Sequence, residues 1–363
     1  MPILQVKPIK TFLILSIVLT AIGLSFVYSA GSYWGKVHYE DSMPFFWKQS
    51  IYGFLGMFAA WVLYKNPMTS QPTFWKVMYA LAVVLLFAVY IPGLGVVRNG
   101  SRSWIQLAGF SIQPAEFVKI AVITYLSTLL ATSAHLKMKW KLSHLLICLV
   151  PAGIILIQPD FGSAFLLIIG AFALLFIAGY PMKFFMVIGV SGILSIVALI
   201  ISAPYRLKRI EAFINPWEDP LGSGFQGIQS LLAIGPSGLF GHGYGQSRQK
   251  FLYLPEPQND FIFSIIVEEM GFIGAVVLIG LFFMFLYTGY RLAVLSSSTM
   301  GSLVIAGFIS MMGSQIFLNI GVVIGLFPVT GVTLPFISYG GTSLFSTWLI
   351  VGIILHFSKD QSK

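Results

Sequence analysis

The sequence predicts an all-α polytopic membrane protein with about ten transmembrane helices. Of its 363 residues, 57% are apolar and only 9% are charged, whereas about 25% of the residues of an average soluble domain are charged. Apolar stretches of about 20 residues, the length that crosses a bilayer as a helix, recur from one end of the chain to the other. Together these observations exclude an ordinary soluble domain, and we expect residues 1–363 to form a single membrane domain.

Each predicted span is an apolar stretch between charged or turn-forming residues. The first is long enough to cross a bilayer and has no small-x-small cleavage site before Gly31, so we interpret it as a span and not as a cleaved signal peptide. The second and fifth stretches are the shortest. The predicted spans cover residues 11–30, 50–64, 77–97, 115–133, 143–158, 161–179, 184–203, 261–288, 300–327 and 340–357.

The distribution of charge predicts the orientation in the membrane. Short loops rich in Lys and Arg stay on the cytoplasmic side, and the basic cluster KMKWK at residues 137–141 is the strongest such signal. We therefore expect both termini inside and the long polar loop between spans seven and eight, about residues 204–260, outside. The single cysteine, Cys148, excludes an intramolecular disulfide.

The formal net charge of +9 does not indicate nucleic-acid binding, because the basic residues are scattered between the spans. Anionic membrane lipids and the positive-inside bias explain these charges better. The sequence therefore predicts membrane lipids as partners and no nucleic acid.

Two outer segments other than the long loop are unusual. Residues 97–117 contain Asn-Gly and Gly-Ser turn signals, and Pro114 suits the first turn of the following helix. Residues 327–343 are apolar but punctuated by Pro and Gly, so they cannot form a simple helix. Irregular backbone at membrane depth must be covered by protein or line a wet cavity, and we expect this of 327–343.

Several charged residues lie close to the predicted membrane, where ionisable groups are costly and often functional. Glu116 and Lys119, three residues apart, share one helix face. They are either a neutralised pair that locks two helices together or part of a site. Asp160 is either the N-cap of the sixth span or a functional carboxylate.

The carboxylates around the start of the eighth span are interpreted differently. A structural role is favoured for Glu268 and Glu269, which can cap the helix or pair with Arg248 or Lys250. Asp260 stands where the polar loop meets an apolar run, and burial there can tune its basicity for use as a general base. Its alternative role is the N-cap of the eighth helix.

The basic residues of the outer segments suit a phosphate-bearing substrate, because guanidinium groups bind phosphates bidentately. The alternative is loop solubility and contact with lipid headgroups. His242 and His356 have no second ligand at metal spacing, so no zinc site is predicted. The outer basic residues are Arg98, Arg102, Arg206, Lys208, Arg209, Arg248 and Lys250.

Five motifs along almost the whole chain resemble those of the SEDS family (shape, elongation, division, sporulation). The first two resemble the FtsW and SpoVE branch more than RodA, and the last is the family signature, which includes Asn319 and Ser338. The motifs are NPWEDPLGSGFQ (215–226), GYGQSRQKFLYLPEPQNDFIFSIIVEEMGFIG (243–274), RNGSRSWI (98–105), FSIQPAEFVK (110–119) and NIGVVIGLFPVTGVTLPFISYGGTS (319–343).

The resemblance implies ten membrane helices in the bacterial cytoplasmic membrane and peptidoglycan glycosyltransferase activity on lipid II at the outer leaflet. It also implies a class B penicillin-binding protein as partner. By the same resemblance Asp260 is the essential acidic residue, and Lys119 and Asp160 match two further family positions.

The mechanism expected from this resemblance has Asp260 as general base in an inverting transfer. The departing diphosphate would be stabilised by Arg102, by Lys119, or by a divalent cation (Mg or Mn) held by Asp160 or Glu116. Arg248, Lys250 and Ser338 complete the predicted substrate-binding set. Two alternatives remain open: a lipid II flippase, and a scaffold that activates the penicillin-binding protein.

Overall fold

The computed structural model of the protein describes residues 8–98, 100–107, 110–135, 141–201, 213–222 and 224–359. Five of the basic residues to which the sequence analysis gave a role lie outside the described residues. The first part of the predicted long loop also lies outside them. The five residues are Lys137 and Lys139 of the basic cluster and Arg206, Lys208 and Arg209 of the loop.

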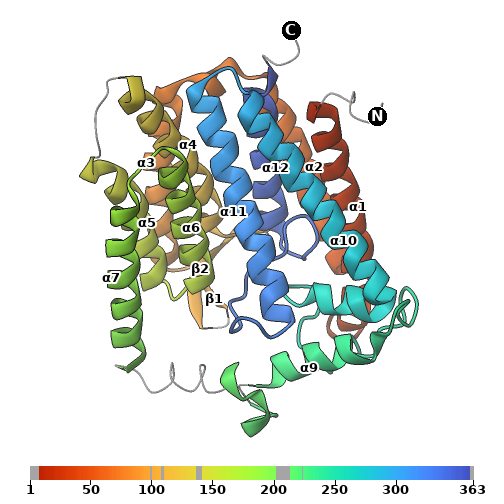
Figure 1. The fold of residues 1–363 in the computed structure, drawn as a ribbon. Helices are drawn as coiled ribbons and strands as arrows, with labels where there is room; N and C mark the ends of the chain where they lie inside the picture. Colours follow the sequence, from red (N-terminus) through yellow and green to blue (C-terminus); the bar gives the residue numbers. More distant parts are fainter. Residues whose placement is uncertain are drawn as a thin grey trace.

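A helix occupies each predicted apolar stretch, and the helices pack side by side in a bundle (Figure 1). By length and composition, five helical segments could cross a membrane: 8–39, 72–90, 114–133, 262–295 and 299–323. Shorter apolar helices accompany them. The helices are α1 (Pro8–Tyr39), α2 (Pro44–Lys65), α3 (Pro72–Phe87), α4 (Pro114–His135), α5 (Leu142–Ile157), α6 (Phe161–Ile177), α7 (Met182–Ile201), α9 (Phe225–Ile234), α10 (Ile262–Leu295), α11 (Thr299–Val323) and α12 (Gly341–Phe357). The exact number of spans stays a prediction.

The prediction of a helix over 77–97 is wrong at its end, and the mostly helical fold contains one small sheet that was not predicted. Helix α3 stops at Phe87, a 3-10 turn follows at Ala88–Tyr90, and the chain then enters a small sheet. Pro92 and Gly93, the latter with φ +83°, form the turn between them, because neither residue favours continuation of a helix.

The sheet has three antiparallel strands in the order β1 (Gly95–Arg98), β2 (Ser101–Leu107) and β3 (Phe110–Ile112). β2 is the central strand and carries Trp104 and Ile105, residue types that favour strands. Pro114 begins α4 directly after β3, as predicted from its preference for a first helical turn. The sheet therefore lies immediately before the helix that carries Glu116 and Lys119.

Helix α11 occupies the centre of the bundle, where it contacts α4, α6, α10 and α12, and α2 packs along α12 (Figure 1). The second contact is close because of a glycine: a Cβ on Gly352 would lie 2.5 Å from the carbonyl oxygen of Ala60. Small residues at such crossings let membrane helices approach one another.

The start of α1 and the end of α12 lie at one end of the bundle, and β1, β2 and α9 lie at the opposite end (Figure 1). The two helices that carry the chain ends thus finish on the same side of the molecule. Which side faces the cytoplasm stays a prediction from the charge distribution.

Residues 324–340 (the re-entrant segment) enter the bundle without forming a helix, as predicted from their Pro and Gly content. Phe336 and Ile337 are buried there. The amide of Gln49 in α2 supports the backbone twice: Nε2 donates to the Ser338 carbonyl (2.9 Å), and Oε1 accepts from the Gly340 N–H (3.1 Å). Polar side chains of the surrounding helices thus replace the hydrogen bonds that a helix would make for itself.

Helix α10 is interrupted at Gly271, whose φ of +68° and ψ of −168° are not helical. The loop before α10, residues 238–261, fits into the interruption and is called the outer loop after its predicted location. The N–H of Gly243 donates to the Glu269 carbonyl (2.9 Å), and the N–H of Phe272 donates to the Gly238 carbonyl (3.0 Å). A Cβ on Gly271 would lie 2.3 Å from the backbone nitrogen of Gly241. The loop can therefore dock only because residue 271 has no side chain.

We expect Gly271→Ala to detach this loop and to lower the free energy of unfolding by about 1–3 kcal/mol from backbone strain alone. Gly280→Ala in the same helix is the control, because no atom lies within 4 Å of its added Cβ. Limited proteolysis of the detergent-solubilised variants, together with their thermal unfolding, measures both effects. Equal protease resistance of the two variants would contradict the docking role of Gly271.

Candidate functional site

Asp260 lies in the outer loop, two residues before Ile262, the first residue of α10. The N-cap residue of α10 is Phe261, which makes no side-chain capping hydrogen bond, so the alternative role of Asp260 as N-cap is wrong. The backbone carbonyl of Asp260 accepts a hydrogen bond from Nδ2 of Asn319 in α11 (2.7 Å). Among the described residues, no side chain is found hydrogen-bonded to its carboxylate, which accepts from the backbone N–H of Asp260 itself.

The environment of the Asp260 carboxylate changes its acidity. Burial raises its pKa from 3.8 to about 6, and the nearby charge of Glu256 acts in the same direction. The group is therefore ionised at neutral pH but holds a proton more readily than an ordinary aspartate. A carboxylate with these properties and no competing partner is suited to proton transfer.

Glu116 and Lys119 form a buried ion pair at the start of α4. Lys119 Nζ lies 2.8 Å from Oε1 of Glu116, and the hydroxyl of Ser346 in α12 donates to the other carboxylate oxygen (2.7 Å). Their exposed fractions are only 7% and 2%. The contact with α12 agrees with a pair that locks two helices, and a role in substrate binding stays a prediction.

Asp160 caps α6, which confirms its predicted structural role. Its Oδ1 accepts from the N–H of Ser163 (3.1 Å). Its Oδ2 accepts from Nε2 of Gln113 (2.7 Å), and Gln113 precedes α4 by one residue. The starts of α4 and α6 are thus tied together, which brings Asp160 near the segment that carries Glu116 and Lys119.

Strand β2 lies against the segment that precedes Asp160, and Arg102 follows Ser101 on this strand. The hydroxyl of Ser101 in β2 donates to the carbonyl of Gln158 (2.5 Å), two residues before Asp160. Arg102 Nε is buried and has no hydrogen-bond partner among the described residues. Its guanidinium carbon lies 6.0 Å from the centre of the Tyr90 ring. Arg102 is therefore a cation with unused hydrogen-bonding capacity.

One side chain connects Asp260 with the cluster at Asp160. Asn319 Nδ2 donates to the carbonyl of Val332 (2.7 Å) as well as to that of Asp260. Val332 in turn packs against the start of α6, where a Cβ on Gly162 would lie 2.8 Å from its methyl group. The sequence assigned no role to Asn319, although a buried amide in an apolar helix is a signal for one.

The side chains of Lys250, Glu268 and Glu269 have partners within the protein. Lys250 pairs with Glu269 (3.4 Å), and Glu268 accepts from the hydroxyl of Ser247 (2.5 Å) and the backbone N–H of Arg248 (2.9 Å). The predicted structural role of Glu268 and Glu269 is confirmed, because these contacts hold the outer loop on α10. A substrate-binding role for Arg248, whose side chain is exposed, and for Lys250 stays a prediction.

Ser338 is also engaged within the protein. Its hydroxyl accepts from the backbone N–H of Leu334 (2.8 Å) and closes a turn in the re-entrant segment. Only 3% of the residue is exposed. Its predicted role in substrate binding is untested, and the observed contact is a structural one.

The arrangement of the carboxylates does not favour the predicted Mg or Mn ion. Both oxygens of Asp160 and both oxygens of Glu116 accept hydrogen bonds from protein groups. No three His, Cys, Asp or Glu side chains are grouped to hold a metal within the described parts of the chain. These carboxylates therefore fit internal hydrogen bonding better than metal coordination.

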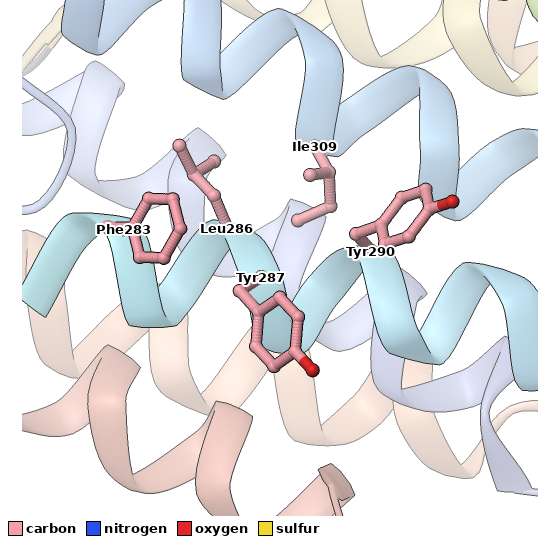
Figure 2. A pocket seen from close by; sticks show the side chains of 5 residues that line it. All are labelled: Phe283, Leu286, Tyr287, Tyr290 and Ile309. Atoms are coloured by element: carbon pink, nitrogen blue, oxygen red, sulfur yellow. The ribbon is translucent and has the colours of Figure 1, made fainter.

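A groove between α10 and α11 is purely apolar apart from two tyrosine hydroxyls (Figure 2). Ile309, the lining residue on α11, lies ten residues before Asn319, which is hydrogen-bonded to Asp260, and ten residues span about 15 Å at the helical rise of 1.5 Å. The groove is therefore separate from Asp260 and offers no group for acid–base chemistry. It is lined by Phe283, Leu286, Tyr287, Tyr290 and Ile309.

We expect Lys119→Met to destabilise the protein by about 3–5 kcal/mol, because it leaves the Glu116 carboxylate buried without its cation. The double variant Glu116→Gln/Lys119→Met should recover most of this loss. Thermal unfolding of the detergent-solubilised proteins measures both. A double variant as unstable as Lys119→Met would show that burial of an unpaired charge is not the cause.

Comparison with known proteins places the chain in a family. Residues 10–363 match the family described as "Cell cycle protein", which covers FtsW, RodA and SpoVE. Stage V sporulation protein E of Bacillus subtilis is 44% identical, with 98% of each chain aligned. A "Probable peptidoglycan glycosyltransferase FtsW" of Trichlorobacter lovleyi is 37% identical, over 95% of this chain and 92% of the relative.

Solved structures are similar over nearly the same extent. RodA of Thermus thermophilus superposes with a TM-score of 0.71 at 26% identity, covering 97% of each chain. A chain from a study of "polymerization and crosslinking by a peptidoglycan synthase complex" superposes with a TM-score of 0.78 at 29% identity, covering 97% of this chain and 98% of that one. Sequence and fold agree, and the chain therefore belongs to the FtsW/RodA/SpoVE family of cell cycle proteins.

Proposed function

We propose that this protein is a peptidoglycan glycosyltransferase that polymerises lipid II into glycan strands at the outer face of the bacterial cytoplasmic membrane. The observation that carries the proposal is the partly buried carboxylate of Asp260. Its pKa is raised to about 6, and no side chain among the described residues is found hydrogen-bonded to its oxygens. The names of the FtsW relatives support the reaction class.

In the proposed reaction, Asp260 takes the proton of the acceptor's GlcNAc 4-hydroxyl. The oxygen attacks the anomeric carbon of the lipid-linked donor from the face opposite the leaving group, and a new glycosidic bond forms with inversion. The bond from that carbon to the diphosphate oxygen breaks, and the electron pair leaves with undecaprenyl diphosphate. A base of this kind contributes about 10²–10⁴-fold to the rate.

The leaving diphosphate needs a cation, and Arg102 has unused hydrogen-bonding capacity to supply it. Its Nε is buried and without a hydrogen-bond partner among the described residues, and guanidinium binds phosphate oxygens bidentately. Lys119 is a second candidate, but Glu116 already offsets much of its charge. We assign Glu116 and Asp160 the task of fixing Lys119 and the start of α6.

We further propose ten membrane spans with both chain ends in the cytoplasm and the loop of about 204–260 outside. The presence of the start of α1 and the end of α12 at one end of the bundle supports this topology (Figure 1). The sheet and the start of α10 then lie at the outer membrane surface, where the lipid-linked sugars would be. Asp260, Arg102 and Asp160 all belong to segments at that end.

A class B penicillin-binding protein is the proposed partner, because a similar solved chain comes from a peptidoglycan synthase complex described by polymerisation and crosslinking. The chain is more similar in sequence to Stage V sporulation protein E and the FtsW relatives than to RodA of Thermus thermophilus. This difference favours a role in sporulation or division over elongation. Flippase and scaffold functions are the alternatives that the following experiment separates.

In an assay run with and without its penicillin-binding protein, we expect the purified protein to polymerise lipid II and Asp260→Asn to lose about 10²–10⁴-fold of the rate while remaining folded. Gel analysis of labelled glycan chains measures the product, and thermal unfolding checks the fold. Equal product from both proteins would remove Asp260 from the chemistry. No product from the wild type, even with the partner, would favour the flippase or the scaffold.

The polymerisation rate should also depend on pH through Asp260. A base must be ionised, so the rate is expected to fall as the pH drops through about 6 and to reach a plateau above pH 7. Initial rates between about pH 4.5 and 8, with enzyme stability checked at each value, measure this. A rate that stays level down to pH 4.5 would mean that the step depends on a group of ordinary carboxylate pKa or on none.

A further inference from the structure

We infer that Asn319 is a positioning residue that holds the main chain of Asp260 at the place where its carboxylate reaches the acceptor sugar. The inference rests on the proposed function and assigns a role to a residue of α11 that itself need not touch the substrate.

The hydrogen bonds of Asn319 join three separate parts of the fold. Its Nδ2 donates to the carbonyl of Asp260 and to that of Val332, each at 2.7 Å. These carbonyls belong to the end of the outer loop and to the re-entrant segment, and Asn319 lies near the outer end of the central helix. Only 1% of Asn319 is exposed, so water does not compete freely for these hydrogen bonds.

The orientation of the Asn319 amide is determined by its partners. Exchanging its oxygen and nitrogen would place an oxygen against two carbonyl oxygens, an arrangement without a proton donor. Its Oδ1 is buried and has no hydrogen-bond partner among the described residues. The fold therefore uses both N–H groups of Asn319, which a hydrophobic residue of similar size cannot supply.

Asn319 is the one side chain found hydrogen-bonded to Asp260 among the described residues. The residues on either side of Asp260 are held by local bonds, from the Asn259 N–H to the Glu256 carbonyl (3.0 Å) and from the Ser264 N–H to the Phe261 carbonyl (3.0 Å). The next bond to a distant segment runs from the Tyr339 N–H to the Gln258 carbonyl (2.8 Å). A displacement of about 1 Å at a catalytic group can cost about 10²-fold in rate, so the loss of Asn319 should act mainly on kcat.

Gln315 provides a matched comparison on the same helix, one turn before Asn319. Its Nε2 donates to the carbonyl of Thr333 (2.9 Å), the residue after Val332, and 6% of the side chain is exposed. Both amides thus anchor the re-entrant segment from α11, but only Asn319 also holds Asp260. Any effect that Asn319→Leu shows and Gln315→Met lacks is assigned to the contact with Asp260.

The experiment measures lipid II polymerisation by the wild-type protein, Asn319→Leu, Gln315→Met and Asp260→Asn, with kcat, KM and the pH dependence of the rate for each active protein. For Asn319→Leu we expect kcat to fall about 10–100-fold with KM within about twofold. The acid limb of its pH profile should move to lower pH, because a displaced carboxylate is less buried. Gln315→Met should keep kcat within about threefold and the wild-type pH profile.

If Asn319→Leu does not fold, the pair Asn319→Ala and Gln315→Ala replaces the first pair, because the smaller side chains leave room for water to satisfy the two carbonyls. Equal losses within a pair, with unchanged pH profiles, would overturn the inference and leave Asn319 as one anchor of the re-entrant segment. A wild-type protein that makes no glycan would instead overturn the proposed function, and Asn319 would then have no base to position.

Discussion

The structure depends on satisfying the hydrogen bonds of backbone that is not helical although it lies inside a helix bundle. An unpaired N–H or C=O group costs several kcal/mol away from water. Side-chain amides on regular helices supply several of the missing partners here: Gln49 bonds to Ser338 and Gly340, and Asn319 bonds to Asp260 and Val332. Because these amides stand on α2 and α11, they tie the irregular segments to regular helices. The site can then be built from loops without being loose.

The same constraint explains where the charges are. A buried carboxylate is tolerated when donors surround it, and Glu116, Asp160, Glu268 and Glu269 each accept two or more hydrogen bonds or an ion pair. Asp260 has no side-chain donor among the described residues and accepts from its own backbone N–H, and burial raises its pKa. A cluster of acids held by other residues fixes the geometry, and one acid without a side-chain partner remains available for proton transfer.

Much of the fold could be predicted from the sequence because a bilayer requires long apolar helices, which composition reveals directly. The re-entrant segment was predictable for the opposite reason, since its Pro and Gly residues exclude a helix at membrane depth. The small sheet at 95–112 was not predicted, because Val96 and Val97 follow an apolar helical run without a break and pairing between strands is not visible in a local pattern. For the site, Asp260 stood out by its position at a polar–apolar boundary. The hydrogen-bond partners of Asp160 and Glu116 did not stand out, because they are distant in sequence. Gln113 is 47 residues from Asp160, and Ser346 is 230 residues from Glu116.

Holding Asp260 without a partner opposes folding, and the sign of the effect can be stated. A carboxylate whose folded pKa lies above its unfolded value binds its proton more tightly in the folded protein, so folding is favoured at low pH. That advantage is lost as the pH rises from 3.8 through about 6, and at neutral pH the ionised Asp260 lowers stability. The fold offsets this cost through contacts that leave the carboxylate untouched: the amide of Asn319 holds its carbonyl, and the hydrogen bonds of Glu268 and Glu269 hold the other end of the same helical segment. Stabilising the main chain while leaving the acid unpaired is how the protein keeps a base that is both fixed in place and reactive.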